Sequence, residues 1–227
     1  MRIDVLTLFP EMFSGILTES ILKRAVENKL LEVNLINFRD FSRNKHHTVD
    51  DTPYGGGQGM VLSVEPIYYA LTSIEGYEDA CKILLTPQGV QYKQHIANEL
   101  KLHDHLILIC GHYEGFDERV RKYVDLEISI GDYVLTGGEI AAMAIIDSVA
   151  RLKDGVLGRE ESFTDDSFYN GLLEYPQYTR PYDFLGDKVP DVLMSGHHKN
   201  IDAWRKEQAL KRTEERRPDL LEEYKKR

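Results

Sequence analysis

The chain has 227 residues, 42% of them hydrophobic and 29% charged, and its formal net charge at pH 7 is −10. This length suits one large domain or two modest ones, with enough apolar residues for a real core. The negative charge argues against indiscriminate binding to nucleic acid, and because no run of about 18 apolar residues occurs, the sequence predicts no membrane span.

The first predicted element is a strand, Arg2–Phe9, and no signal-peptide pattern precedes it. A helix is expected to begin at Pro10, because apolar residues recur on one face as far as Ala25. Leu31–Asn37 alternates well enough to predict a second strand. Val64–Ile74 predicts a second helix.

A long polar segment, Phe38–Gly59, lies between the second strand and the second helix. A loop of this length inside a compact domain is usually functional or disordered, and its aromatic, histidine and paired aspartate residues favour function. It leads into the glycine run Tyr54–Met60, which lacks the spacing of a Rossmann fingerprint and the Gly-Lys-Ser/Thr ending of a P-loop. The run predicts neither nucleotide site, and it leaves open a mobile loop that closes over a substrate.

Three apolar strands are each followed by a polar turn that contains glycine. The strands are Lys82–Thr86, Leu106–Cys110 and Leu126–Ile130, and their turns are Pro87–Gly89, Gly111–Gly115 and Gly131–Gly138. Helical patterns at Tyr92–Leu102 and from Asp117 separate them, which favours an α/β fold on a mostly parallel sheet. Such turns at the carboxyl ends of parallel strands suggest a ligand pocket. Glycine would let the backbone approach a ligand there, but tight turns alone would explain it equally well.

Glu139–Ala150 predicts a helix that is apolar nearly all round, and such a helix must be buried. The polar stretch after it lacks periodicity and is expected to be a linker, and the proline-containing Gly171–Asp191 is expected to be extended. Helical periodicity returns at Asn200, the expected cap, with Trp204 as the core anchor and Pro218 in the first turn of a last helix. These segments predict a small helical second domain.

The C-terminal part of the chain is basic, whereas the rest is acidic. From His197 to Arg227 there are ten Lys and Arg against seven Asp and Glu, and the remaining residues carry 18 against 31. A basic tail on an acidic body is compatible with local contact to RNA, although a solvated helical face would have the same composition.

The two cysteines, Cys81 and Cys110, stand in apolar, strand-like contexts. This context indicates buried thiols in a reducing compartment. The sequence therefore predicts a cytoplasmic protein.

No metal site is predicted. The pairs His46-His47 and His197-His198 are adjacent in sequence, so on a helix or strand their side chains would point apart rather than toward one ion. The cysteines are not interleaved with histidines at ligand spacing either.

Two acids in the linker are candidates for catalysis. Asp165 and Asp166 lie between Phe163 and Phe168, an arrangement that could fold over a substrate. A carboxylate in a desolvated pocket gains basicity and can act as a general base. Arg151, at the end of the apolar helix, could stabilise negative charge that develops on a substrate. An N-cap aspartate and a surface arginine are the alternative interpretation.

Long motifs in one order carry a resemblance to a known family. They are Leu8–Phe13, Val49–Asp51, Tyr54–Met60, Cys110–Gly115, Ile130–Glu139, Gly155–Gly158, Asp166–Phe168 and Tyr178–Pro181. Over essentially its whole length the chain resembles the bacterial tRNA (guanine-37-N1)-methyltransferases of the SPOUT superfamily.

The resemblance implies a SPOUT-type parallel sheet with a deep trefoil knot and a small helical C-terminal domain. The expected domains are a knotted methyl-donor-binding domain over 1–159, a flexible linker over 160–170 and a mainly helical tRNA-binding domain over 171–227. It also implies a homodimer with active sites at the subunit interface. Sequence patterns alone would not suggest a knot, because knots are nearly absent among folds.

The implied reaction transfers a methyl group from S-adenosyl-L-methionine to N1 of guanosine 37 in the tRNA anticodon loop. The donor pocket would map onto Leu85, Pro87, Gly111, Tyr113, Glu114, Ile130, Gly131, Asp132, Tyr133, Val134, Leu135, Gly137 and Gly138. The resemblance implies Asp166 as general base and Arg151 as its partner. Family members are reported to need a divalent ion, expected to be Mg²⁺, for which the sequence identifies no site.

Two departures from the family pattern bear on function. His112 stands where some relatives carry Arg, which leaves the contribution of this side chain open. The sequence given ends at Arg227, earlier than many members, so the last helix and its RNA contacts are in question. The alternatives are a SPOUT methyltransferase acting on another RNA position and a non-catalytic RNA-binding module.

Overall fold

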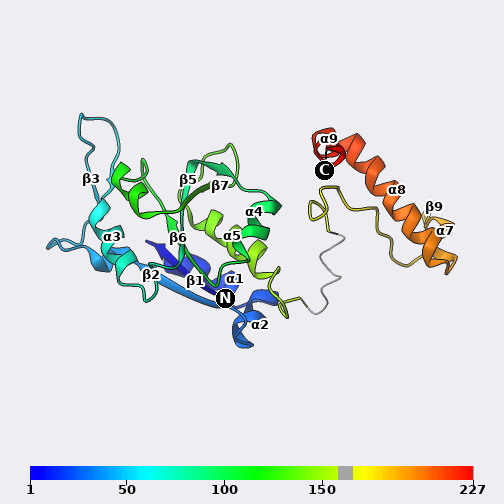
Figure 1. Cartoon of the computed structure of the whole chain (residues 1–227), viewed down its shortest axis with the longest axis horizontal. Helices are drawn as coiled ribbons and strands as arrows, with labels where there is room; N and C mark the ends of the chain where they lie inside the picture. The colour runs from blue at the N-terminus through cyan, green and yellow to red at the C-terminus, as the bar shows by residue number, and fades with distance from the viewer. Residues whose placement is uncertain (158–165, 227) are drawn as a thin grey trace. The chain divides into compact units, whose positions relative to one another are not determined.

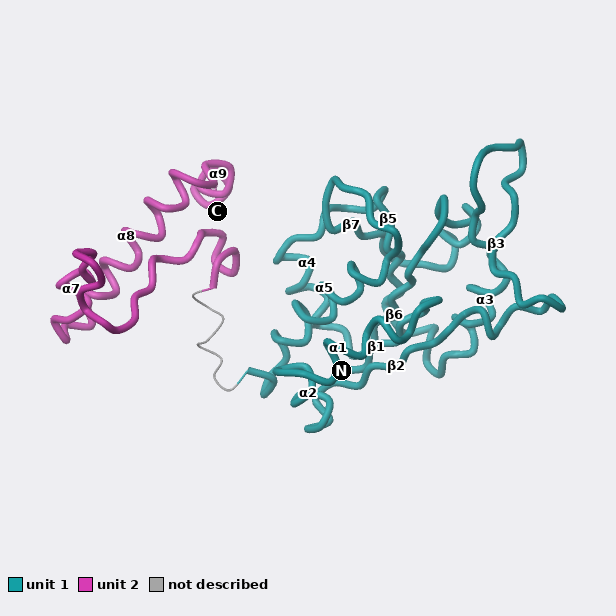
Figure 2. Tube along the Cα trace, turned by 180° about the vertical axis from the view of Figure 1, so that it is seen from behind, with its two compact units in different colours: residues 1–158 teal, residues 159–227 magenta. Residues whose placement is uncertain are grey.

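The computed structural model describes residues 1–157 and 166–226 (Figure 1). The chain divides into two compact units, Met1–Gly158 and Arg159–Arg227 (Figure 2). The expected domain boundary at residue 159, part of the expected linker, Phe163 and Asp165 lie outside the described residues.

The first unit is built on a five-stranded parallel sheet with the order β2-β1-β6-β5-β7 (Figure 1). The strands are β1 (Arg2–Thr7), β2 (Glu32–Asn37), β5 (Cys81–Gln91), β6 (His105–Cys110) and β7 (Leu126–Ser129). The predicted α/β class with a parallel sheet is confirmed. All these neighbours pair in the parallel sense, so the carboxyl ends of β5, β6 and β7 lie at one edge.

Helices cover the sheet. They are α1 (Ser14–Leu17), α2 (Ser20–Glu27), α3 (Val64–Thr72), α4 (Gln94–Leu100) and α5 (Glu139–Ala150), with the 3₁₀ turns η1 (Pro10–Phe13), η2 (Phe38–Phe41) and η3 (Glu118–Tyr123) and the short pair β3 (Asp50–Asp51) and β4 (Val61–Leu62). Ile107 and Ile109 of β6 belong to one apolar cluster with Ile67 of α3. Helix α5 packs against β1 and β6. Leu106–Cys110 is fully buried. A parallel strand that is covered on both faces has an uninterrupted apolar sequence, as β6 does.

The prediction of one continuous helix from Pro10 to Ala25 is wrong. The chain forms η1, α1 and α2 in turn, and Ser20, at the start of α2, has a φ of +55°. A non-glycine residue in this left-handed region breaks the helical path, although the spacing of apolar residues continues across it.

Helix α5 is less buried than its composition predicts. Ala142, Ile146 and Val149 are fully buried, but Ile140 is 48% exposed, and Ala144 and Asp147 are also exposed. The expectation that the whole helix is covered is therefore wrong for the single chain, because one face of it meets solvent.

Strand β5 continues through the turn predicted at Pro87–Gly89. Leu85 and Val90 both pair with Ile128 of β7, so residues 86–89 form an irregularity inside the strand rather than its end. A bulge of this kind re-aims side chains without ending the pairing. Pro87 and Gln88 lie within this irregularity.

The second unit is mainly helical. It contains the hairpin β8 (Asp183–Phe184) and β9 (Asp187–Lys188), followed by α7 (Asp191–Met194), α8 (His198–Arg216) and α9 (Pro218–Lys225). Helix α8 begins before the predicted cap Asn200, and its N-cap residue is His197. Trp204 is only partly buried, with its ring 6.5 Å from that of Tyr178. None of the described helices is both long and apolar enough to span a bilayer.

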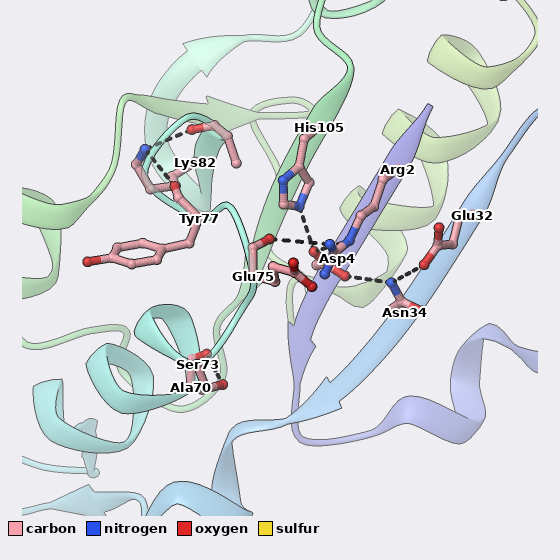
Figure 3. Close-up of polar contacts among 11 residues, drawn as sticks. Arg2, Asp4, Glu32, Asn34, Ala70, Ser73, Glu75, Tyr77, Lys82 and His105 are labelled. Carbon is pink, nitrogen blue, oxygen red and sulfur yellow. Dashed lines mark hydrogen bonds and ion pairs between the residues drawn. The ribbon is translucent and has the colours of Figure 1, made fainter.

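A buried carboxylate joins three strands near the amino-terminal edge of the sheet (Figure 3). Asp4 of β1 is fully buried, and its Oδ2 lies 2.6 Å from His105 Nε2 and 3.0 Å from Arg2 Nε. Asn34 of β2 donates to Asp4 Oδ1 at 2.8 Å. This cluster ties β2, β1 and β6 together at the edge opposite to the glycine-containing turns.

Candidate functional site

A cavity of about 370 Å³ lies where β5, β6 and β7 reach their carboxyl ends. The sequence-predicted binding residues that line it are Leu85, Pro87, Gly111, Tyr113, Glu114, Ile130, Gly131, Tyr133, Val134, Leu135, Gly137 and Gly138. Asp132 is exposed and is not among the lining residues. The structure thus brings together three segments that are separate in the sequence.

Three glycines at these turns lie too close to other parts of the chain to carry a side chain freely. A Cβ on Gly111 would lie 2.5 Å from the Phe116 ring, and a Cβ on Gly138 would lie 2.8 Å from the Cα of Cys110. A Cβ on Gly137 would overlap the His112 ring. Close intramolecular contact therefore explains glycine at these three positions without any ligand.

Replacing Gly138 by Ala is expected to lower the free energy of unfolding by about 1–3 kcal/mol, the usual cost of overpacking. The new methyl group would meet the backbone of Cys110 and Gly111, which cannot move aside as a flexible side chain could. Urea denaturation measures the effect. Gly15→Ala is the matched control, because nothing lies within 4 Å of its Cβ position; equal stability of the two variants would contradict the prediction.

A buried carboxylate is hydrogen-bonded to His112, a residue that lines the cavity. Glu139, the first residue of α5, is 1% exposed, and it accepts hydrogen bonds from Thr7 Oγ1 at 2.7 Å and from His112 Nε2 at 2.8 Å. Burial raises the pKa of the neighbouring Cys110 thiol well above its ordinary value, and the Glu139 charge raises it further. Sequence reasoning missed Thr7 and Glu139, although a glutamate opening an otherwise apolar helix is an available signal.

An ion-pair cluster holds the outer rim of the cavity. Arg121 Nη2 donates to Gln88 Oε1 at 2.6 Å, and the same guanidinium pairs with Glu127 at 3.1 Å and with Glu118. Gln88, Glu118 and Arg121 line the cavity. None of the three was predicted as a binding residue.

The polar segment before α3 has hydrogen bonds of its own and a contact to α3. Ser42 Oγ donates to the Thr48 carbonyl at 2.6 Å, and the Arg43 guanidinium lies 3.5 Å from the centre of the Tyr69 ring. The glycine run ends against the cavity, because the Glu114 amide donates to the Met60 carbonyl at 3.0 Å. Tyr54 near the start of the run is fully exposed.

The two proposed catalytic residues belong to different units. Arg151 follows the last residue of α5 and is partly buried. Asp166 belongs to the second unit, where it lines a separate cavity of about 510 Å³ together with Leu172, Tyr175 and Arg205. All residues that line the 370 Å³ cavity therefore belong to the first unit, whereas Asp166 belongs to the second.

Within residues 1–157 and 166–226, no three His, Cys, Asp or Glu side chains are grouped so that they could hold a metal ion.

Comparison with known proteins gives a match over nearly the whole chain. Residues 1–223 match the family model of tRNA (Guanine-1)-methyltransferase TrmD. A protein of Geobacillus kaustophilus is 62% identical over 226 residues, covering 99% of this chain and 93% of its own; one of Brevibacillus brevis is 60% identical over 223 residues, covering 98% and 92%. One of Staphylococcus aureus is 59% identical over 225 residues, covering 99% and 92%. All three are named tRNA (guanine-N(1)-)-methyltransferase. The chain therefore belongs to the tRNA (guanine-1)-methyltransferase family.

Proposed function

We propose that this chain transfers a methyl group from S-adenosyl-L-methionine to N1 of guanosine 37 in the tRNA anticodon loop. The observation that carries the proposal is the match of about 60% identity, over nearly the full chain, to enzymes named for methylation of guanine N1 in tRNA. The position of the guanosine and the identity of the donor come from the family resemblance.

The cavity of the first unit suits the donor. Its volume of about 370 Å³ falls within the range of about 300–1,000 Å³ that is usual for small-molecule sites. Leu85, Ile130 and Leu135 line the cavity and would give an apolar wall for the adenine ring. Glycines of the turns also line it, so main-chain groups there would be within reach of the donor. The Glu114 carboxylate lines the cavity and would attract a cationic group of the donor. When bound, S-adenosyl-L-methionine supplies an electrophilic methyl group on a sulfonium.

The residues of the chain then have two tasks. Guanine N1 carries a proton at neutral pH, so a base must remove it before nitrogen can attack a methyl group, and Asp166 is the proposed base. Arg151 would stabilise the negative charge that spreads onto O6. Holding the guanine in line with the methyl group supplies much of the rate, because both partners are then positioned for attack.

The proposed trefoil knot has support in the connection order. Strand β5 lies between β6 and β7, so the chain passes from one side of β5 to the other between these strands. After β7 it returns to the end of β6, where the Gly138 amide donates to the Gly111 carbonyl at 2.9 Å. A return of this kind is compatible with threading through the 111–125 segment.

The proposed homodimer has support in exposed apolar side chains of the first unit. Ile140 on α5 is half exposed, and Val134 beside the cavity is almost fully exposed. A second copy that covered this face would complete the burial that the composition of α5 predicts. In such a dimer Asp166 of one subunit serves the donor cavity of the other, so activity requires the dimer.

We assign tRNA contact to the segment Phe38–Gly59 and to the second unit, proposed as the tRNA-binding domain over 171–227. Lys and Arg of α8 would meet phosphates, and the exposed Tyr54 ring near the glycine run is available for stacking on an unstacked base. The guanine must leave the loop stack to reach the donor. A cytoplasmic location agrees with this substrate, and chelation of Mg²⁺ during the assay tests the expected ion requirement.

A methylation assay on two tRNA transcripts tests the proposal. We expect transfer of a labelled methyl group to a transcript with guanine at position 37 and none to the same transcript with adenine there, with N1-methylguanosine as the product in mass spectrometry. A methylated nucleoside at another position would favour a different SPOUT specificity. Calorimetry in which S-adenosyl-L-methionine does not bind would favour a non-catalytic RNA-binding module.

A further inference from the structure

Three residues from distant parts of the sequence meet directly behind the donor cavity. Thr7 ends β1, His112 follows β6, and Glu139 begins α5. The Glu139 carboxylate joins them through the 2.7 Å and 2.8 Å hydrogen bonds described above. Of the three, only His112 lines the cavity, and its side chain is 16% exposed.

The carboxylate determines how the His112 ring is held. An ionised carboxylate accepts but does not donate hydrogen bonds, so with Glu139 ionised the 2.8 Å contact places the shared hydrogen on Nε2 of His112. The ring also lies against Phe9, with the ring centres 4.8 Å apart. Because Gly137 has no side chain, the His112 ring can occupy the space next to it. Both the orientation and the tautomer of His112 are therefore set from behind the cavity wall.

His112 lies inside the turn that presents cavity residues. Gly111, Tyr113 and Glu114 of the same turn line the cavity. Tyr113 has a φ of +60°, a conformation that costs about 1 kcal/mol or more for a non-glycine residue and persists only when its surroundings hold it. The side chain of His112 supplies an anchor at the neighbouring position.

We propose that His112 is a positioning residue for the methyl donor: its bond to the buried Glu139–Thr7 pair holds the turn Gly111–Gly115 in the conformation that binds S-adenosyl-L-methionine. The inference rests on the proposed function. Any side chain that reaches Glu139 as a hydrogen-bond donor can serve, and an arginine in place of His112 would satisfy the same condition.

The test compares donor affinity with stability in a set of variants. For His112→Ala, calorimetry with S-adenosyl-L-methionine should give a Kd raised by about tenfold, the loss expected for one hydrogen bond to a charged group. His112→Arg should restore most of the affinity. His103→Ala, at an exposed histidine, is the matched control and should bind as the wild type does.

The double variant His112→Ala/Glu139→Gln distinguishes two explanations of a raised Kd in His112→Ala. In one, the turn loses its anchor; in the other, the protein is only destabilised by the buried charge of Glu139. His112→Ala alone leaves a buried carboxylate with one neutral partner, which lowers stability. The second change removes that charge, so urea denaturation should show recovered stability while the Kd stays raised. Recovery of both stability and affinity in the double variant would overturn the proposal, as would wild-type affinity in His112→Ala. Failure of the wild-type protein to bind the donor would instead reject the donor cavity itself.

Discussion

Replacing Asp166 by Ala is expected to lower the rate of methyl transfer to tRNA by about 10²- to 10⁴-fold, the contribution typical of a general base. Donor binding should stay at the wild-type level, because the proposed donor cavity is lined by residues of the first unit and Asp166 belongs to the second. Single-turnover kinetics with labelled donor measure the first quantity, and calorimetry measures the second.

Two further variants make this result specific to proton removal. Asp166→Asn keeps the shape of the side chain but cannot take a proton at neutral pH, so it should be about as inactive as Asp166→Ala. Asp187→Ala removes an exposed carboxylate from the β8–β9 hairpin of the same unit and should keep its activity. Near-full activity in Asp166→Ala would reject Asp166 as the base.

The sheet and the place of the cavity could be predicted because local signals carry them. An uninterrupted apolar run such as Leu106–Cys110 indicates a strand buried on both faces, and three such runs followed by glycine-containing turns indicate one functional edge. The observed parallel order and the cavity at that edge agree with this prediction. Periodicity also predicted the second unit's helices, although the start of α8 at His198 differs from the predicted cap.

What could not be predicted depends on contacts between distant residues. Thr7 and Glu139 are 132 positions apart, and the sequence around either residue does not indicate that they form a hydrogen bond. The irregularity in β5 depends on its register with β7, which the sequence of β5 alone does not contain. The break at Ser20 has a related cause: the apolar spacing continues across it, so periodicity favours one helix even though the backbone turns there.

Asp4 is another residue whose environment depends on long-range contacts, and its replacement by Ala is expected to have the largest effect on stability. The change removes the carboxylate that lies against His105, forms an ion pair with Arg2 and accepts a hydrogen bond from Asn34 (Figure 3). It also leaves a cavity among the three strands. Breaking a buried ion pair by removing one partner costs about 3–5 kcal/mol. Because Arg2 and His105 are partly exposed and can turn toward water, we expect a loss near the lower end, about 3 kcal/mol, measured by urea denaturation.

The position of this cluster in the sheet allows an effect on stability to be distinguished from an effect on donor binding. Asp4 contacts residues near the amino-terminal edge of the sheet, whereas the proposed donor cavity lies at the carboxyl ends of β5, β6 and β7. Under conditions where Asp4→Ala is still folded, its donor affinity should therefore equal that of the wild type, in contrast to His112→Ala. Asp104→Ala, which removes an exposed carboxylate next to His105, should change neither quantity. A weakened donor affinity in folded Asp4→Ala would mean that the two edges of the sheet are coupled and that the cavity is not supported locally.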